Sequence, residues 1–179
     1  MYIMVCPQCE AITEEGTRCK RHTCVRFPYC FQHMRIKEGL ALKDSDIPNA
    51  GKGVFATRDF PLKKREIDLK AKKPIAYYSA KEITHEPDPN SAYVLKVNDR
   101  EYLDSKDPSN YTGRYINSFK NHPDREKRSA NVRFAKNQRI YWKDDRAVVP
   151  IKQTKPIKKG QELFLNYGNA YPFERRVEI

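Results

Sequence analysis

All five cysteines of this 179-residue chain lie within its first thirty residues, and this clustering constrains the fold more than any other feature. His22 and His33 lie among them or just beyond. The opening Met1–Val5 does not resemble a secretory signal, and the number of cysteines is odd. Both features favour metal ligation over a disulfide framework. About thirty residues are also too few to bury a core alone, so a metal cross-link would hold this segment.

Four of these side chains have the composition of a closed structural zinc site. The pattern Cys-x9-Cys-x10-Cys-x2-His supplies three thiolates and one imidazole, a tetrahedral ligand set. We therefore predict a zinc-binding module and linker over residues 1–44, with the metal bound by Cys9, Cys19, Cys30 and His33. Cys6, His22 and Cys24 remain. They are either alternative ligands, since Cys6-x2-Cys9 is itself a metal spacing, or part of a second site that lacks a partner.

The charge of the chain favours acidic partners. It carries 35 Lys and Arg against 23 Asp and Glu, a net charge of +12. A basic surface suits nucleic acid or nucleosomes, although a solvated surface of mixed charge explains the same balance. The mean hydropathy is −0.86 and no apolar run reaches the ~18 residues of a membrane span. We expect an intracellular protein without a membrane segment.

Residues 45–179 read as short strands and turns. Twelve prolines leave little room for long helices. Residues 93–97 and 100–103 predict a hairpin around Asn98-Asp99. Three further strands in series predict a meander, over residues 131–135, 139–142 and 147–151. Ser79 with Glu82 fits a capping box and predicts a short helix. The fold class we expect is mainly β, with brief helical insertions.

A glycine motif at residues 51–56, Gly-Lys-Gly-Val-Phe-Ala, admits two interpretations. It satisfies the G-x-G-x-x-G/A pattern of a dinucleotide-binding turn, but that turn needs a strand before it and a helix after it. Residues 47–50 are not a buried strand, and Pro61 would soon interrupt a helix. We therefore interpret the motif as a tight turn that enters a strand over residues 54–57, with glycines that let the backbone approach a ligand closely.

Three more motifs follow this turn in order: Arg-Tyr-Ile-Asn at 114–117, Asn-Val-Arg-Phe at 131–134, and Lys-Gly-Gln-Glu-Leu-Phe-Leu-Asn-Tyr-Gly at 159–168. Together the four resemble the SET domain of protein lysine methyltransferases over about residues 46–173. The resemblance implies a β-clip fold of small sheets for residues 45–179. It also implies that the 114–117 and 167–168 segments meet as a knot-like core.

The same resemblance implies a function. The chain would be an S-adenosylmethionine-dependent protein lysine N-methyltransferase that acts on histone or another basic protein, and it would be nuclear. Tyr167 would be the catalytic residue that orients the lysine amine and the methyl group. Phe134 and Leu165 would line the lysine channel, and since neither has a hydroxyl, more than one methyl addition is permitted. The cofactor would be bound by Lys52, Gly53, Tyr93, Arg114, Asn117 and Tyr171.

The sequence also departs from the family pattern. Asn117-Ser118-Phe119 stands where many SET enzymes have Asn-His-Ser, and the insert at 120–128 is longer and more charged than usual. These departures leave a second interpretation open. In it the chain is a catalytically weak or inactive SET-like module that binds chromatin or nucleic acid.

Overall fold

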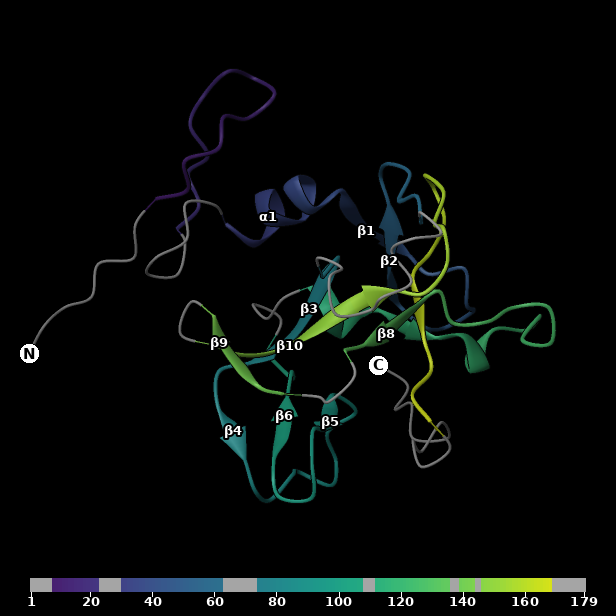
Figure 1. Cartoon of the computed structure of the whole chain (residues 1–179). Helices are drawn as coiled ribbons and strands as arrows, with labels where there is room; N and C mark the ends of the chain where they lie inside the picture. The colour runs from purple at the N-terminus through teal and green to yellow at the C-terminus, as the bar shows by residue number, and fades with distance from the viewer. Residues whose placement is uncertain are drawn as a thin grey trace, which may run out of the picture.

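The computed structural model describes residues 8–22, 30–62, 74–107, 112–135, 139–143 and 146–168 (Figure 1). In these ranges the chain forms one α-helix, two short 3-10 helices and four small sheets. The mainly β fold is therefore confirmed. None of the described helices is long and apolar enough to cross a membrane.

The N-terminal hairpin and the helix after it bring the cysteines together. Bridges Gln8↔His22 and Ile12↔Arg18 close an antiparallel hairpin, with Gly16 at its tip in the left-handed region (φ 75°). Helix α1 (Phe31–Glu38) begins after Cys30. It ends at Gly39, whose φ of 78° lets its N–H cap the carbonyls of the last turn.

Strand β1 (Leu40–Asp44) follows the helix and pairs antiparallel with β2 (Lys52–Ala56). Gly51, at a φ of 68°, makes the turn into β2, so the expected strand after the glycine motif is present. The division between two domains at residue 44 stays a prediction, although β1 lies before that boundary and pairs with a strand beyond it.

The central sheet is built on β10 (Arg146–Gln153), which is buried along almost its whole length. One edge of β10 pairs with β3 (Ala76–Ala80). The other edge pairs with both β9 (Tyr141–Lys143) and β8 (Val132–Phe134), one after the other. The predicted meander is therefore wrong in its pairing, because β8 joins β10 rather than β9. A strand that is buried along eight residues needs neighbours on both edges, and it is long enough for two three-residue strands end to end.

The helix predicted from Ser79 and Glu82 is also wrong. Ser79 is fully buried within β3, where pairing with β10 outweighs the local capping signal. Strands β4 (Ile83–Thr84), β6 (Tyr102–Asp104) and β5 (Val94–Lys96) form a separate sheet in that order, seen below the central sheet in Figure 1. The hairpin at Asn98 is confirmed, and the Asn98 side chain accepts two backbone hydrogen bonds that close the turn.

Two short strands far apart in sequence form the crossing that the resemblance predicted. Strand β7 (Asn117–Ser118) lies between the 3-10 helices η2 (Thr112–Tyr115) and η3 (Phe119–Asn121). It pairs in parallel with β11 (Phe164–Leu165). Ile116 and Leu163, which flank this pair, are both fully buried, so the crossing lies in the main core.

Candidate functional site

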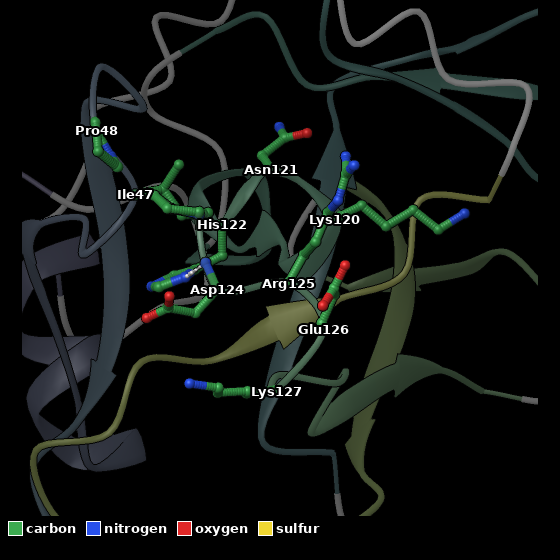
Figure 2. Close-up of a pocket in the computed structure, with 10 residues that line it drawn as sticks. Ile47, Pro48, Lys120, Asn121, His122, Asp124, Arg125, Glu126 and Lys127 are labelled. Carbon is green, nitrogen blue, oxygen red and sulfur yellow. Dashed lines mark hydrogen bonds between the residues drawn. The ribbon is translucent and has the colours of Figure 1, made fainter.

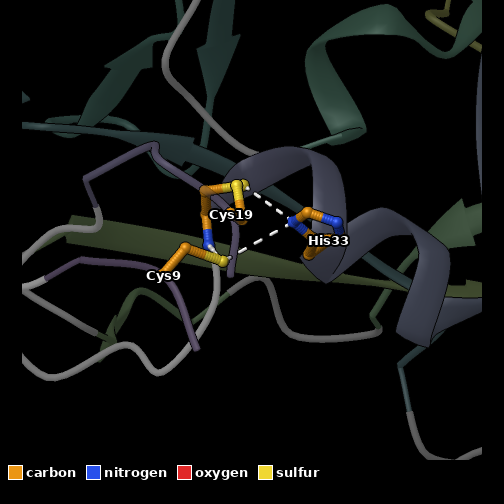
Figure 3. Close-up of side chains that lie close together, drawn as sticks. Cys9, Cys19 and His33 are labelled. Atoms are coloured by element: carbon orange, nitrogen blue, oxygen red, sulfur yellow. Dashed lines mark hydrogen bonds between the residues drawn. The ribbon is translucent and has the colours of Figure 1, made fainter. Parts of the chain in front are cut away.

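The four predicted metal ligands converge. Their ligand atoms all lie within 4.8 Å of one another, and the thiols of Cys9, Cys19 and Cys30 are buried. Figure 3 shows the side chains of Cys9 and Cys19 turned toward the His33 ring. Cys9 and Cys19 come from the hairpin, whereas Cys30 and His33 lie three residues apart at the start of α1, on one helical face. His22 is exposed at the end of the hairpin and is not in this group, while Cys6 and Cys24 lie outside the described residues.

The chemistry of this donor set fits zinc. His33 Nδ1 lies 3.5 Å from Cys9 Sγ and 3.3 Å from Cys30 Sγ. Burial raises the pKa of Cys9, but hydrogen bonds from the backbone of Cys30 and Ala11 outweigh it, so that the pKa is lowered. Burial and the neighbouring Cys9 thiol raise the pKa of Cys30. Three thiols and an imidazole that crowd one another in this way are suited to a cation that replaces their protons.

A second cluster centres on Glu162, which our sequence reasoning did not single out. Its side chain is 2% exposed, and its carboxylate accepts hydrogen bonds from Ser45 Oγ (2.8 Å) and from the Asp46 N–H (2.9 Å). Asn117 Nδ2 lies 3.3 Å from the same carboxylate. The sequence signal that could have indicated it is the motif Lys-Gly-Gln-Glu-Leu, in which an acidic residue directly precedes the apolar run Leu163-Phe164-Leu165.

The position of Glu162 also explains why residue 53 is a glycine. A Cβ on Gly53 would overlap Glu162 Oε1, so only glycine leaves room for the carboxylate. The close approach that we expected a ligand to make at Gly53 is thus made by a protein side chain. The neighbouring Lys52 carbonyl accepts a hydrogen bond from Asn117 Nδ2 (3.1 Å), while the Lys52 ammonium is exposed and pairs with Asp44 (2.6 Å).

Tyr167 lies at the crossing of β7 and β11. Its hydroxyl donates to the Ile116 carbonyl at 2.5 Å, and its ring packs partly buried against the core. The next residue, Gly168, accepts a hydrogen bond at its carbonyl from Lys120 Nζ (3.2 Å). The tyrosine is therefore held from both sides against the 116–120 segment.

Arg114 lies between two tyrosine rings. Its guanidinium carbon is 4.3 Å from the Tyr93 ring centroid and 4.7 Å from that of Tyr115, and it donates to the Tyr115 hydroxyl (3.1 Å). Arg114 Nε is buried and has no hydrogen-bond partner in the described part of the chain. The structure thus places Arg114 and Tyr93 together, with the Tyr93 carbonyl held by the Tyr78 hydroxyl.

The two predicted channel residues differ in burial. Phe134 is half-buried and meets Tyr78 edge to face, with ring centroids 5.9 Å apart. Leu165 is 1% exposed and belongs to the core beside β7. Tyr171, the last predicted cofactor contact, lies outside the described residues.

An open hollow of about 1120 Å³ lies beside the Glu162 cluster. One wall is Ile47 and Pro48, from the loop after β1, and the other is the charged insert over residues 120–127 (Figure 2). Within the insert, His122 is buried and its Nδ1 accepts the Asp124 N–H (3.0 Å). Asn121 also belongs to this lining, and its Nδ2 is buried without a partner among the described residues.

Comparison with known proteins gives one family and several solved structures. The family described as the SET domain matches residues 51–168. A Plasmodium falciparum protein assigned as a histone methyltransferase is 15% identical, with a TM-score of 0.44, 74% of this chain covered and 96% of that one. The polycomb repressive complex 2 of Chaetomium thermophilum gives 21% identity and a TM-score of 0.46, also in a form bound to S-adenosylmethionine. There 75% of this chain is covered but only 16% of the other. No curated protein matches.

Proposed function

The chain belongs to the SET-domain family, and from that premise we propose that it is an S-adenosylmethionine-dependent protein lysine N-methyltransferase. The observation that carries the proposal is the contact of the Tyr167 hydroxyl with the Ile116 carbonyl, beside the parallel pair β7 and β11. This contact brings the Arg-Tyr-Ile-Asn and Tyr-Gly motifs into one place. Either motif alone would carry little weight.

We place the cofactor at the hollow. The volume of the hollow, about 1120 Å³, leaves room for a nucleoside-sized ligand. Lys52 and Gly53, at the start of β2, lie with Asn117 in the Glu162 cluster next to the hollow, and these residues would hold the methionine portion. Arg114 and Tyr93 would border the place where cofactor and lysine meet, and Tyr171 would stack on the adenine. The cofactor supplies a methyl group on a sulfonium.

The protein's part in the reaction is alignment and removal of water. Displacement at a methyl group needs the attacking amine in line with the bond that breaks, so positioning provides most of the rate gain. A lysine has a pKa of ~10.4 in water, and only its neutral form attacks. A channel lined by the half-buried Tyr167 and Phe134 would keep water from the amine, and this desolvation would disfavour the ammonium and lower that pKa. The Tyr167 hydroxyl and the Ile116 carbonyl would orient the amine.

We propose that the substrate is histone or another basic protein and that the protein acts in the nucleus. Leu165 and Phe134 have no hydroxyl that could restrain a methylated amine, so the proposal allows more than one methyl per lysine. In the N-terminal module, Cys9, Cys19, Cys30 and His33 would bind one structural zinc ion.

Radiolabelled methyl transfer tests the proposal. Purified protein and labelled S-adenosylmethionine are incubated with core histones and with a basic protein from outside chromatin, while calorimetry measures cofactor binding. We expect cofactor binding and label on lysine. Absence of both would reject the enzymatic function and favour the catalytically inactive, chromatin-binding alternative.

Nucleic-acid binding is a second candidate role, favoured by two exposed aromatic side chains. Tyr141 and Trp142 in β9 are 53% and 64% exposed, and Arg139 next to them is also exposed. Aromatic rings among basic residues suit stacking of unpaired bases. Trp142 is the only tryptophan in the chain, so its fluorescence reports directly on this site. Quenching by a single-stranded oligonucleotide, weaker at high salt, would support the role, and unchanged fluorescence would reject it.

A further inference from the structure

Glu162 forms its hydrogen bonds as an acceptor. Ser45 Oγ and Asn117 Nδ2 contact Oε1, and the Asp46 N–H contacts Oε2. A buried carboxylate is costly unless donors compensate it, and these contacts do so from two directions. The charge thereby ties the loop after β1 to strand β7, two segments that lie more than seventy residues apart.

The hydroxyl of Ser45 extends this network into the first wall of the hollow. It has a single proton, which it donates to Glu162, and its lone pairs accept from the Ile47 N–H (3.1 Å) and from Asn117 Nδ2 (3.2 Å). Ser45 thus uses its proton and both lone pairs, although the two protons of the Asn117 amide are shared among three acceptors, Ser45 Oγ, the Lys52 carbonyl and Glu162 Oε1. Since Ile47 lines the hollow, the orientation of that wall depends on the carboxylate.

Asn117 extends the network to the start of β2 and to the second wall. Its Nδ2 reaches the Lys52 carbonyl as well as Glu162, so the first residue of β2 is tied to strand β7. Gly53 leaves the space that the carboxylate occupies. Beyond Asn117 the chain passes through Ser118 directly into η3 and the insert that forms the other wall.

We propose that Glu162 is a positioning residue that holds both walls of the hollow and the start of β2, at Lys52 and Gly53, in the arrangement that cofactor binding requires. This inference rests on the proposed function, because the cofactor site is part of that proposal. In this proposal Glu162 contacts no reacting atom. It acts through Ser45, Asp46 and Asn117.

Glu162→Gln tests the inference without leaving a cavity. The side chain keeps its size, but its NH2 group must face at least one of the present donors in either orientation. We expect hydrogen exchange of the 44–53 and 116–121 segments to accelerate at least tenfold. We also expect the dissociation constant for S-adenosylmethionine, from calorimetry, to rise at least tenfold. Glu86→Gln makes the same chemical change at an exposed position and should alter neither quantity.

The two readouts separate the possible outcomes. Faster exchange in Glu162→Gln with unchanged cofactor affinity would overturn the positioning role, and so would unchanged exchange. If the unmodified protein binds no cofactor, the proposed function fails instead, and the exchange data alone then decide whether Glu162 sets the walls. Should Glu162→Gln not fold, Ser45→Ala removes only one donor of the network, and we expect smaller changes in the same direction.

Discussion

The hydroxyl of Tyr167 donates to the backbone carbonyl of Ile116 across 51 residues of sequence, at a distance of 2.5 Å. The contact joins the C-terminal Tyr-Gly motif to the segment that precedes Asn117. The hydrogen bond fixes the orientation of the Tyr167 phenol, and a group that aligns a lysine amine would need such a fixed orientation.

We expect Tyr167→Phe to lower methyl transfer by at least about 10²-fold, the usual cost of removing one oriented donor from a catalytic site. Loss of the hydrogen bond should cost only about 1 kcal/mol of folding free energy, because the ring remains. Methyl transfer and urea unfolding measure the two effects. Tyr102→Phe, at a half-buried tyrosine of β6 that has no part in the proposed site, is the matched control. Full activity in Tyr167→Phe would contradict the assignment.

Arg114→Lys should lower kcat/KM by about tenfold. A lysine keeps the charge but cannot stack its head group flat between the Tyr93 and Tyr115 rings, and cation–π contacts of this kind are worth ~0.5–2 kcal/mol. Steady-state kinetics with varied cofactor give the comparison, and Arg100→Lys at an exposed turn should behave like the unmodified protein. Unaltered kinetics in Arg114→Lys would mean that the stacked arginine has no part in the site.

Asn131→Ala should destabilise the crossing of β7 and β11. The Asn131 side chain donates to the Glu162 carbonyl and accepts from the Phe164 N–H, both at 2.8 Å, so it clamps the chain on the two sides of Leu163. Leaving these backbone groups unpaired should cost about 2–3 kcal/mol. Urea unfolding measures the loss. Asn90→Ala, at an exposed loop, should be nearly neutral, and equal stability of both variants would refute the clamp.

Gly53→Ala should cost more than Gly160→Ala, although only Gly160 has a positive φ. Gly160 (φ 86°) has open space around it, so a methyl there adds about 1–2 kcal/mol of backbone strain. At Gly53 the methyl would overlap the Glu162 carboxylate, and the buried network would have to move. We expect a loss of about 3 kcal/mol or more in thermal or urea unfolding. A smaller loss at Gly53 than at Gly160 would show that the carboxylate yields easily.

The intact protein should contain one zinc ion per chain, by elemental analysis. Replacing two ligands together, Cys19→Ser with Cys30→Ser, should abolish binding and lower the melting temperature, because two of four ligands are lost. Cys6→Ser should retain the metal if the four clustered residues are the ligands. Loss of zinc in Cys6→Ser would favour the alternative ligand set, and absence of zinc from the intact protein would remove the site.

The sequence by itself predicted the features that depend on near neighbours or on residue types in order. The Cys/His set converges as its spacing suggested, and the hairpin at Asn98 is closed by that residue's own side chain. The family and the mainly β fold followed from four ordered motifs. The ligand role, the cofactor contacts and the catalytic tyrosine remain predictions.

Tertiary structure decided what depends on distant partners. Ser79 forms part of a buried strand instead of capping a helix, because β10 supplies its neighbour from about seventy residues away. The same holds for Glu162, whose partners Ser45 and Asn117 come from elsewhere in the chain. A capping or turn signal acts over three or four residues. A buried charge, in contrast, must be compensated by the hydrogen-bond donors that the folded chain brings to it, and no local sequence pattern specifies those donors.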